Sequence, residues 1–151
     1  MKVYYSDTSV GKVKFWTLLI LFVLGGVGYY SLEVLFRGFS HWSMALCGGI
    51  CLCLIYLANR RLSHRPLILR ALIGAVIITA VEFAAGCILN LYLHWGIWDY
   101  SHLPLNLWGQ ITPVFSGVWF LLCIPVCIAC SFADGLALRR RVRTDIRKAK
   151  P

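Results

Sequence analysis

Three acidic side chains lie inside stretches that are otherwise strongly apolar: Glu33, Glu82 and Asp134. An acidic residue inside a membrane span costs roughly 2.5–3.5 kcal/mol on insertion scales, so each one needs a partner, a proton or access to water. Buried carboxylates of this kind bind cations or carry protons, and a carboxylate with a tuned pKa can act as a general base. These three residues are therefore the first candidates for function.

Glu33 and Arg37 are four residues apart, which places them on the same face of a helix. An ion pair between them would lower the cost of both near the end of an apolar span. Arg37 is also a candidate ligand-binding residue, because a guanidinium forks onto carboxylate or phosphate. The alternative is an interfacial pair that only snorkels to water.

Glu82 lies near the middle of the apolar stretch 67–93, too deep to snorkel easily. Its helix face, in steps of three and four residues, is small or polar throughout: Ala75, Thr79, Glu82, Gly86 and Asn90. Such a stripe faces other helices and not lipid, so Glu82 is predicted to point into a bundle. There it would be protonated, paired with a group such as Arg37, or exposed to a wet cavity. A purely structural hydrogen bond is the alternative to a functional role.

Segment 95–110 contains no Lys or Arg and is too apolar for an ordinary solvated loop. Its aromatic residues suit the level of the lipid headgroups, and its glycines and Pro104 prevent one continuous helix. Irregular backbone at membrane depth needs cover from protein or a wet cavity. We therefore predict a lid or re-entrant hairpin over the helix ends, with an aromatic belt at the interface as the alternative.

The sequence thus predicts a polar pocket that opens outward, with Glu33 and Arg37 at its mouth and Glu82 at its floor. The candidate ligand-binding residues are Glu33, Arg37, Glu82, Asn90, Asp99, His102 and Asn106. Asp134 lies just before the arginine run at 139–143 and is expected to form a local charge pair. No metal or cofactor is expected, and the seven cysteines, all within apolar stretches, are interpreted as small packing residues. A soft-metal or redox site is the alternative for the cysteines.

The elements that must position these residues are membrane spans. Hydrophobic residues make up 60% of the 151-residue chain and charged residues 14%, against about 45–50% and 25% in soluble domains. A span needs about 20 residues. The sequence predicts an all-α, four-helix membrane bundle with helices at about 15–36, 41–58, 67–93 and 111–138. A leader over residues 1–14 and a basic tail over 139–151 flank the membrane domain, 15–138.

The charge distribution predicts the orientation. Of the 15 Lys and Arg residues, Arg37 alone falls in the predicted outer segments. The positive-inside rule then places both termini in the cytoplasm, and a bacterial cytoplasmic membrane is the expected location. The net charge of +9 is spread over short blocks between apolar spans, so anionic lipid is a better partner than nucleic acid.

Several sequence elements resemble the ABC-transporter type IV permease family, the CmpB-like membrane proteins. The more specific ones are Trp98-Asp-Tyr-Ser101 and Gly109-Gln110. The others are Glu33 to Met44, Gly48-Gly49, Ile78 to Gly86, Asn90, Pro104, Asn106 and Trp119. The resemblance covers most of residues 20–125. It implies a transporter component, supports the roles of Glu33, Arg37, Glu82 and Asp99, and implies further copies or other membrane subunits as partners.

Three functions remain open at this level. The favoured one is a permease-like protein that binds an anionic, zwitterionic or lipid-linked ligand in the outward pocket. The second is a membrane-embedded enzyme acting on a lipid, with Glu82 or Asp99 as general base near His102. The third is a non-catalytic subunit whose polar stripes only assemble helices.

Overall fold

The computed structural model describes residues 13–148 of the chain, with the side chains described through residue 136. Its elements are α1 (Phe15–Arg37), α2 (Trp42–Arg61), α3 (Leu67–Gly86), the π-helix η1 (Cys87–Tyr92) and α4 (Pro113–Lys148). Four stretches are long and apolar enough to cross a membrane: Phe15–Arg37, Trp42–Arg61, Leu67–Tyr92 and Pro113–Leu136. The prediction of an all-helical integral membrane protein with four spans is confirmed.

Two helix ends differ from the prediction. α3 stops at Gly86, and the chain continues as a π-helix in which the N–H of Leu93 donates to the carbonyl of Ile88 over 2.9 Å. A π-helical turn changes the direction in which the following side chains point, and such turns recur at functional sites. α4 does not end near residue 138 but continues as helix through Lys148, so part of the predicted tail is helical.

Glycines bring α1 and α2 into close contact as an antiparallel hairpin. A Cβ atom added at Gly25 would lie 2.5 Å from the carbonyl oxygen of Gly48, and one added at Gly26 would lie 2.7 Å from that of Ala45. Small residues allow helix backbones to approach in lipid, where packing and not water exclusion drives association. Gly38, with φ of +79°, ends α1 and donates its N–H to Val34.

The remaining helices form the core. α2 packs on both α3 and α4, α3 packs on α4, and α1 packs on α2. Buried small and apolar side chains fill the space between α2, α3 and α4: Cys51, Ile55, Ala71, Ile78, Cys123 and Cys127. α1 reaches α4 through aromatic side chains, because the rings of Tyr29 and Trp119 lie 5.8 Å apart between centroids. α1 is thus the helix least enclosed by the bundle.

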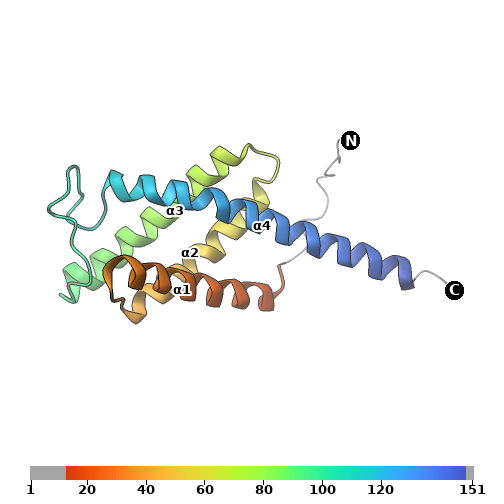
Figure 1. The fold of residues 1–151 in the computed structure, drawn as a ribbon, viewed down its shortest axis with the longest axis horizontal. Helices are drawn as coiled ribbons and strands as arrows, with labels where there is room; N and C mark the ends of the chain where they lie inside the picture. Colours follow the sequence, from red (N-terminus) through yellow and green to blue (C-terminus); the bar gives the residue numbers. More distant parts are fainter. Residues whose placement is uncertain (1–12, 149–151) are drawn as a thin grey trace.

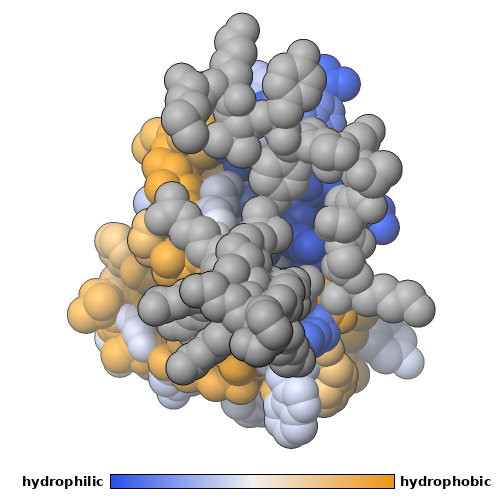
Figure 2. All heavy atoms as spheres, turned by 90° about the vertical axis from the view of Figure 1, so that its right-hand side faces the viewer, coloured by the Kyte–Doolittle hydropathy of each residue, from blue (hydrophilic) through white to orange (hydrophobic). Residues whose placement is uncertain are grey.

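The two ends of the bundle differ in character. Figure 1 shows segment 93–112 at the same end as the turn between α1 and α2, while the turn between α2 and α3 lies at the other end and α4 projects beyond it. We call the first end the lid end. Figure 2 is viewed from the side toward which α4 projects. It shows hydrophobic residues along the left side and the lower edge, and hydrophilic residues gathered toward the upper right.

Candidate functional site

The centre of the site is Glu82, which lies on α3 and is only 5% exposed. Tyr100 donates its hydroxyl to one carboxylate oxygen over 3.1 Å. Trp119 of α4 donates its indole N–H to the other oxygen over 2.9 Å. Among the described residues, no basic side chain forms an ion pair with this carboxylate. The prediction that Glu82 faces the bundle interior is confirmed.

Arg37 does not pair with Glu82, contrary to one of the predicted arrangements. Its guanidinium donates to Glu33 over 3.0 Å, so the ion pair expected from the four-residue spacing forms. A second guanidinium nitrogen donates to the carbonyl of Ile97 over 2.6 Å. Ser40 donates its hydroxyl to the other oxygen of Glu33 over 2.5 Å. Arg37 therefore joins the end of α1 to segment 93–112.

A run of four aromatic rings passes beside Glu82. Tyr100 stacks on Phe115 with 4.5 Å between ring centroids, and Phe115 lies 6.3 Å from Trp119. Trp119 in turn lies 5.8 Å from Tyr29 of α1. Tyr29 thereby brings α1 to the end of this run, next to the ring whose indole N–H reaches Glu82. The run connects segment 93–112, α4 and α1 around one buried acid.

Tyr100 is suited to act as a hydrogen-bond donor here. Burial and the neighbouring Glu82 carboxylate raise the pKa of Tyr100 well above its ordinary value. Both effects disfavour a phenolate, since burial penalises the charged form and a nearby negative charge repels it. Tyr100 therefore keeps its proton, and its hydroxyl donates a hydrogen bond to Glu82.

Asn90 on η1 fixes the position of segment 93–112. Its amide nitrogen donates to the carbonyl of Trp98 over 3.0 Å and to the side-chain oxygen of Gln110 over 2.8 Å. Its amide oxygen accepts from the N–H of Ile97 over 2.7 Å. Trp98 donates its indole N–H to the carbonyl of Gln110 over 3.0 Å. These bonds hold the start and the end of the segment together.

The α3 side of the predicted pocket is filled by packing. A Cβ atom on Gly86 would lie 2.5 Å from the side-chain oxygen of Gln110, so Gln110 occupies the space that Gly86 leaves. Thr79 shares a 3.0 Å hydrogen bond with Ser116 of α4. The small, polar stripe on α3 therefore serves to seat α4 and segment 93–112, and it does not line an open wall.

Asp99 and Asn106 stabilise the fold of the segment itself. Asp99 accepts from the hydroxyl of Ser101 over 2.5 Å and from its backbone N–H over 2.8 Å. These hydrogen bonds, and the nearby His102, hold the pKa of Asp99 below its usual range. Asn106 donates to the carbonyl of Leu103 and accepts from the N–H of Gly109.

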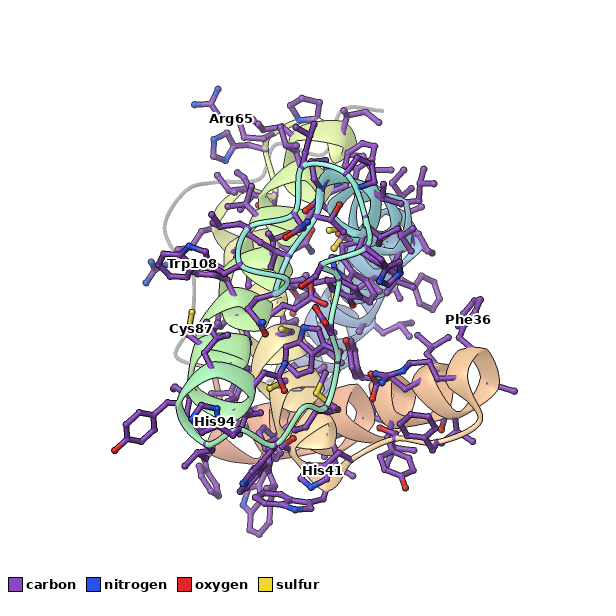
Figure 3. All side chains as sticks on the ribbon, turned by 90° about the vertical axis from the view of Figure 1, so that its left-hand side faces the viewer. Phe36, His41, Arg65, Cys87, His94 and Trp108 are labelled. Atoms are coloured by element: carbon purple, nitrogen blue, oxygen red, sulfur yellow. The ribbon has the colours of Figure 1, made fainter. Side chains whose placement is uncertain are left out.

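Figure 3 looks directly at the lid end. Segment 93–112 crosses the ends of the helices, with Phe36 and Trp108 pointing outward on opposite sides. The structure thus groups the seven predicted ligand-binding residues by location. Glu33 and Arg37 pair with each other at the end of α1, and Glu82 is hydrogen-bonded to two members of the aromatic run. Asn90 anchors the segment, whose own turns contain the remaining three residues: Asp99, His102 and Asn106.

The sequence alone does not predict the partners of Glu82. It identifies Tyr100 as an aromatic residue of the outer segment and Trp119 as part of the family resemblance, and it gives no reason to single out Tyr29. The available signal was spacing, because Phe115 and Trp119 are four residues apart and form an aromatic face on one helix. Nothing in the sequence indicated that this face meets Glu82.

A second polar cluster lies at the opposite end of the bundle. Asp134 accepts from the hydroxyl of Tyr56 over 2.7 Å and lies 3.6 Å from the guanidinium of Arg60. Its pairing is therefore with α2, while the side chains of the arginine run at 139–143 lie outside the described side chains. Arg70 donates to Asn59 over 3.0 Å and to Ser131 over 2.9 Å, and so ties α3 to α2 and α4.

The seven cysteines are all free thiols. Cys123 illustrates their packing role, because a Cβ atom on Gly74 would lie 2.7 Å from its sulfur. The described residues contain no group of three or more His, Cys, Asp or Glu side chains placed to hold a metal ion.

Comparison with known protein families gives a match over most of the chain. The model of the family described as "Putative ABC-transporter type IV" matches residues 27–133, a stretch that includes Tyr29, Glu33, Arg37, Glu82, Tyr100 and Trp119. No curated protein and no solved structure matches the chain.

Proposed function

Because this chain belongs to the ABC-transporter type IV family, we propose that it is a membrane-spanning transporter component that binds its ligand at the lid end. Arg37 takes an anionic part of the ligand, and Glu82 takes a cation or a proton. The lid end faces the extracytoplasmic side, and both termini lie in the cytoplasm. Further copies of the chain, or other membrane subunits, complete the assembly.

One observation carries this proposal: Glu82 is a buried carboxylate whose two hydrogen-bond donors among the described residues are both neutral side chains. Each oxygen of Glu82 accepts one hydrogen bond, from Tyr100 or from Trp119. Hydrogen bonds from neutral groups stabilise a charge but do not neutralise it, and an uncompensated charge inside a membrane protein is costly. A proton or a bound cation removes this cost, and an exchangeable positive charge is what a transporter can couple to movement of a solute.

Arg37 supports the same function at the rim of the site. Its side chain is 32% exposed, while the side chain of its partner Glu33 is 11% exposed. Two of the five N–H donors of the guanidinium account for the bonds to Glu33 and Ile97. The other donors can take a carboxylate or phosphate oxygen. An anionic group that takes the donor now held by the carbonyl of Ile97 instead would loosen segment 93–112 next to the site.

The test is ligand binding by purified protein in lipid nanodiscs, measured as a shift in unfolding temperature with a panel of anionic, zwitterionic and cationic solutes and short-chain lipids. We expect at least one class to stabilise the wild-type protein and to lose that effect in Arg37→Gln or Glu82→Gln. Arg61→Gln, at the opposite end of the bundle, serves as the control and should bind like the wild type. Equal binding by all variants would disprove a site at the lid end.

A further inference from the structure

Resting on the proposed function, we infer that Glu82 and the four aromatic rings beside it form an occluded site for an organic ammonium ion. The ion is either a free solute or the headgroup of a lipid. The four rings are those of Tyr29, Tyr100, Phe115 and Trp119, and we call them, with Glu82, the ammonium site.

The charge balance of the region leaves a place for one positive charge. Glu33 and Arg37 neutralise each other through their ion pair. Glu82 forms no ion pair with any cation among the described residues. A monovalent cation at Glu82 therefore brings the three side chains to neutrality, which is the inexpensive state at low dielectric.

The chemistry of the surroundings selects the type of cation. A metal ion such as Mg²⁺ or Ca²⁺ requires about six oxygen ligands. Both hydrogen-bond partners of Glu82 are instead aromatic side chains, of which only Tyr100 brings an oxygen atom. The face of an aromatic ring carries negative potential and attracts an alkylated ammonium ion, most strongly for Trp and Tyr. A carboxylate beside several such rings is the arrangement that recognises a quaternary ammonium group.

Tyr100 explains how the site is closed without a ligand. It comes from segment 93–112, stacks on Phe115 and supplies a hydroxyl to Glu82. An entering ammonium ion takes the place of this hydroxyl beside the carboxylate, while Trp119 of α4 keeps its own hydrogen bond. The segment moves with Tyr100, and the carbonyl of Ile97 that Arg37 holds belongs to the same segment. Entry of the ammonium ion beside Glu82 therefore moves the same segment whose carbonyl at Ile97 is bound by Arg37, and favours breaking of that bond.

The experiment compares choline with its neutral isostere 3,3-dimethylbutan-1-ol by calorimetric titration of the purified wild-type protein. Choline should bind and the isostere should bind roughly tenfold more weakly or not at all, because only choline carries the charge. This comparison needs no variant. A parallel titration with short-chain phosphatidylcholine assigns the source, since tighter binding than choline indicates a lipid headgroup and weaker binding indicates a free solute.

Two variants localise the binding. Glu82→Gln keeps the shape and accepting oxygen but removes the charge, and should weaken choline binding about tenfold or more. Tyr29→Leu removes a ring of the site and should weaken binding severalfold. Tyr30→Leu, the adjacent exposed tyrosine on α1, should leave it unchanged. If Glu82→Gln does not fold, two comparisons still test the ammonium site. These are choline against its neutral isostere, and Tyr29→Leu against Tyr30→Leu.

The outcomes separate this inference from the proposed function. Choline and its isostere binding equally, or neither binding, overturns the ammonium site. If anionic solutes still bind in an Arg37-dependent manner in that case, the proposed transporter function stands. If no solute or lipid of any class binds at the lid end, both are overturned.

Discussion

Trp119 of α4 and Glu82 of α3 are joined by a hydrogen bond of 2.9 Å in which the indole N–H donates to the carboxylate. The bond crosses the interface between the two helices that flank segment 93–112. It gives a buried acid a fixed position and gives α4 a fixed rotation, since the indole must face α3. The neighbouring contacts of Tyr29, Phe115 and Tyr100 depend on that rotation.

The first prediction concerns this bond. Trp119→Phe keeps a ring but removes the donor, and we expect it to lower the free energy of unfolding by about 1–3 kcal/mol, because a buried acceptor loses its partner. Thermal unfolding in detergent measures the change. Trp16→Phe alters a tryptophan that is 69% exposed at the start of α1, and should have little effect. Equal unfolding temperatures for the two variants would contradict the assigned role of Trp119.

The second prediction tests the contact between α1 and α2. Gly25→Ala places a Cβ atom 2.5 Å from the carbonyl oxygen of Gly48 and 2.6 Å from the Cβ of Leu52, so the helices must separate. We expect destabilisation by about 1–3 kcal/mol from overpacking. Gly28→Ala, three residues further along α1, meets no atom within 4 Å and should be neutral or slightly stabilising. A larger loss at Gly28 would refute this packing.

The third prediction tests the seating of segment 93–112. Gly86→Ala would bring a Cβ atom to within 2.5 Å of the side-chain oxygen and 3.0 Å of the Cβ of Gln110. The displaced Gln110 loses its hydrogen bond to Asn90, so we expect a lower unfolding temperature and faster proteolysis within the segment. Gly117→Ala on α4 has no neighbour within 4 Å and provides the matched control.

The fourth prediction concerns the bond from Arg37 to Ile97. Arg37→Gln removes both the ion pair with Glu33 and the 2.6 Å bond to the carbonyl of Ile97. We expect hydrogen exchange of the backbone amides in segment 93–112 to become several-fold faster, because local opening costs less. Hydrogen-exchange mass spectrometry gives the measurement. The control variant Arg61→Gln should leave the exchange rates of these amides unchanged. Unchanged rates in Arg37→Gln would show that the guanidinium does not restrain the segment.

The fifth prediction concerns orientation. In a variant with all seven cysteines replaced, a single cysteine at Leu105, which is 84% exposed, should react with a membrane-impermeant maleimide added from outside intact cells. A reporter fused after Pro151 should report the cytoplasm. Labelling at Leu105 only after the cells are opened would show that the lid end faces inward.

The sequence by itself determined the spans and the residues that do not belong in lipid. Hydropathy and charge are properties of each residue that add along the chain, so four apolar stretches and the unusual positions of Glu33, Glu82 and Asp134 were readable without a structure. The pairing of Glu33 with Arg37 was readable for the same reason, because a four-residue spacing on a helix is local geometry.

Only the tertiary structure decided what surrounds Glu82. Its partners Tyr100 and Trp119 are 18 and 37 residues away in the chain, and they meet it through the rotation of α4 and the course of segment 93–112. That course depends on the π-helical turn at Asn90 and on the space above Gly86, neither of which leaves a periodic signal in the sequence. Contacts between distant segments depend on how side chains fill shared volume, and this is a property of the packed bundle and not of any one stretch of chain.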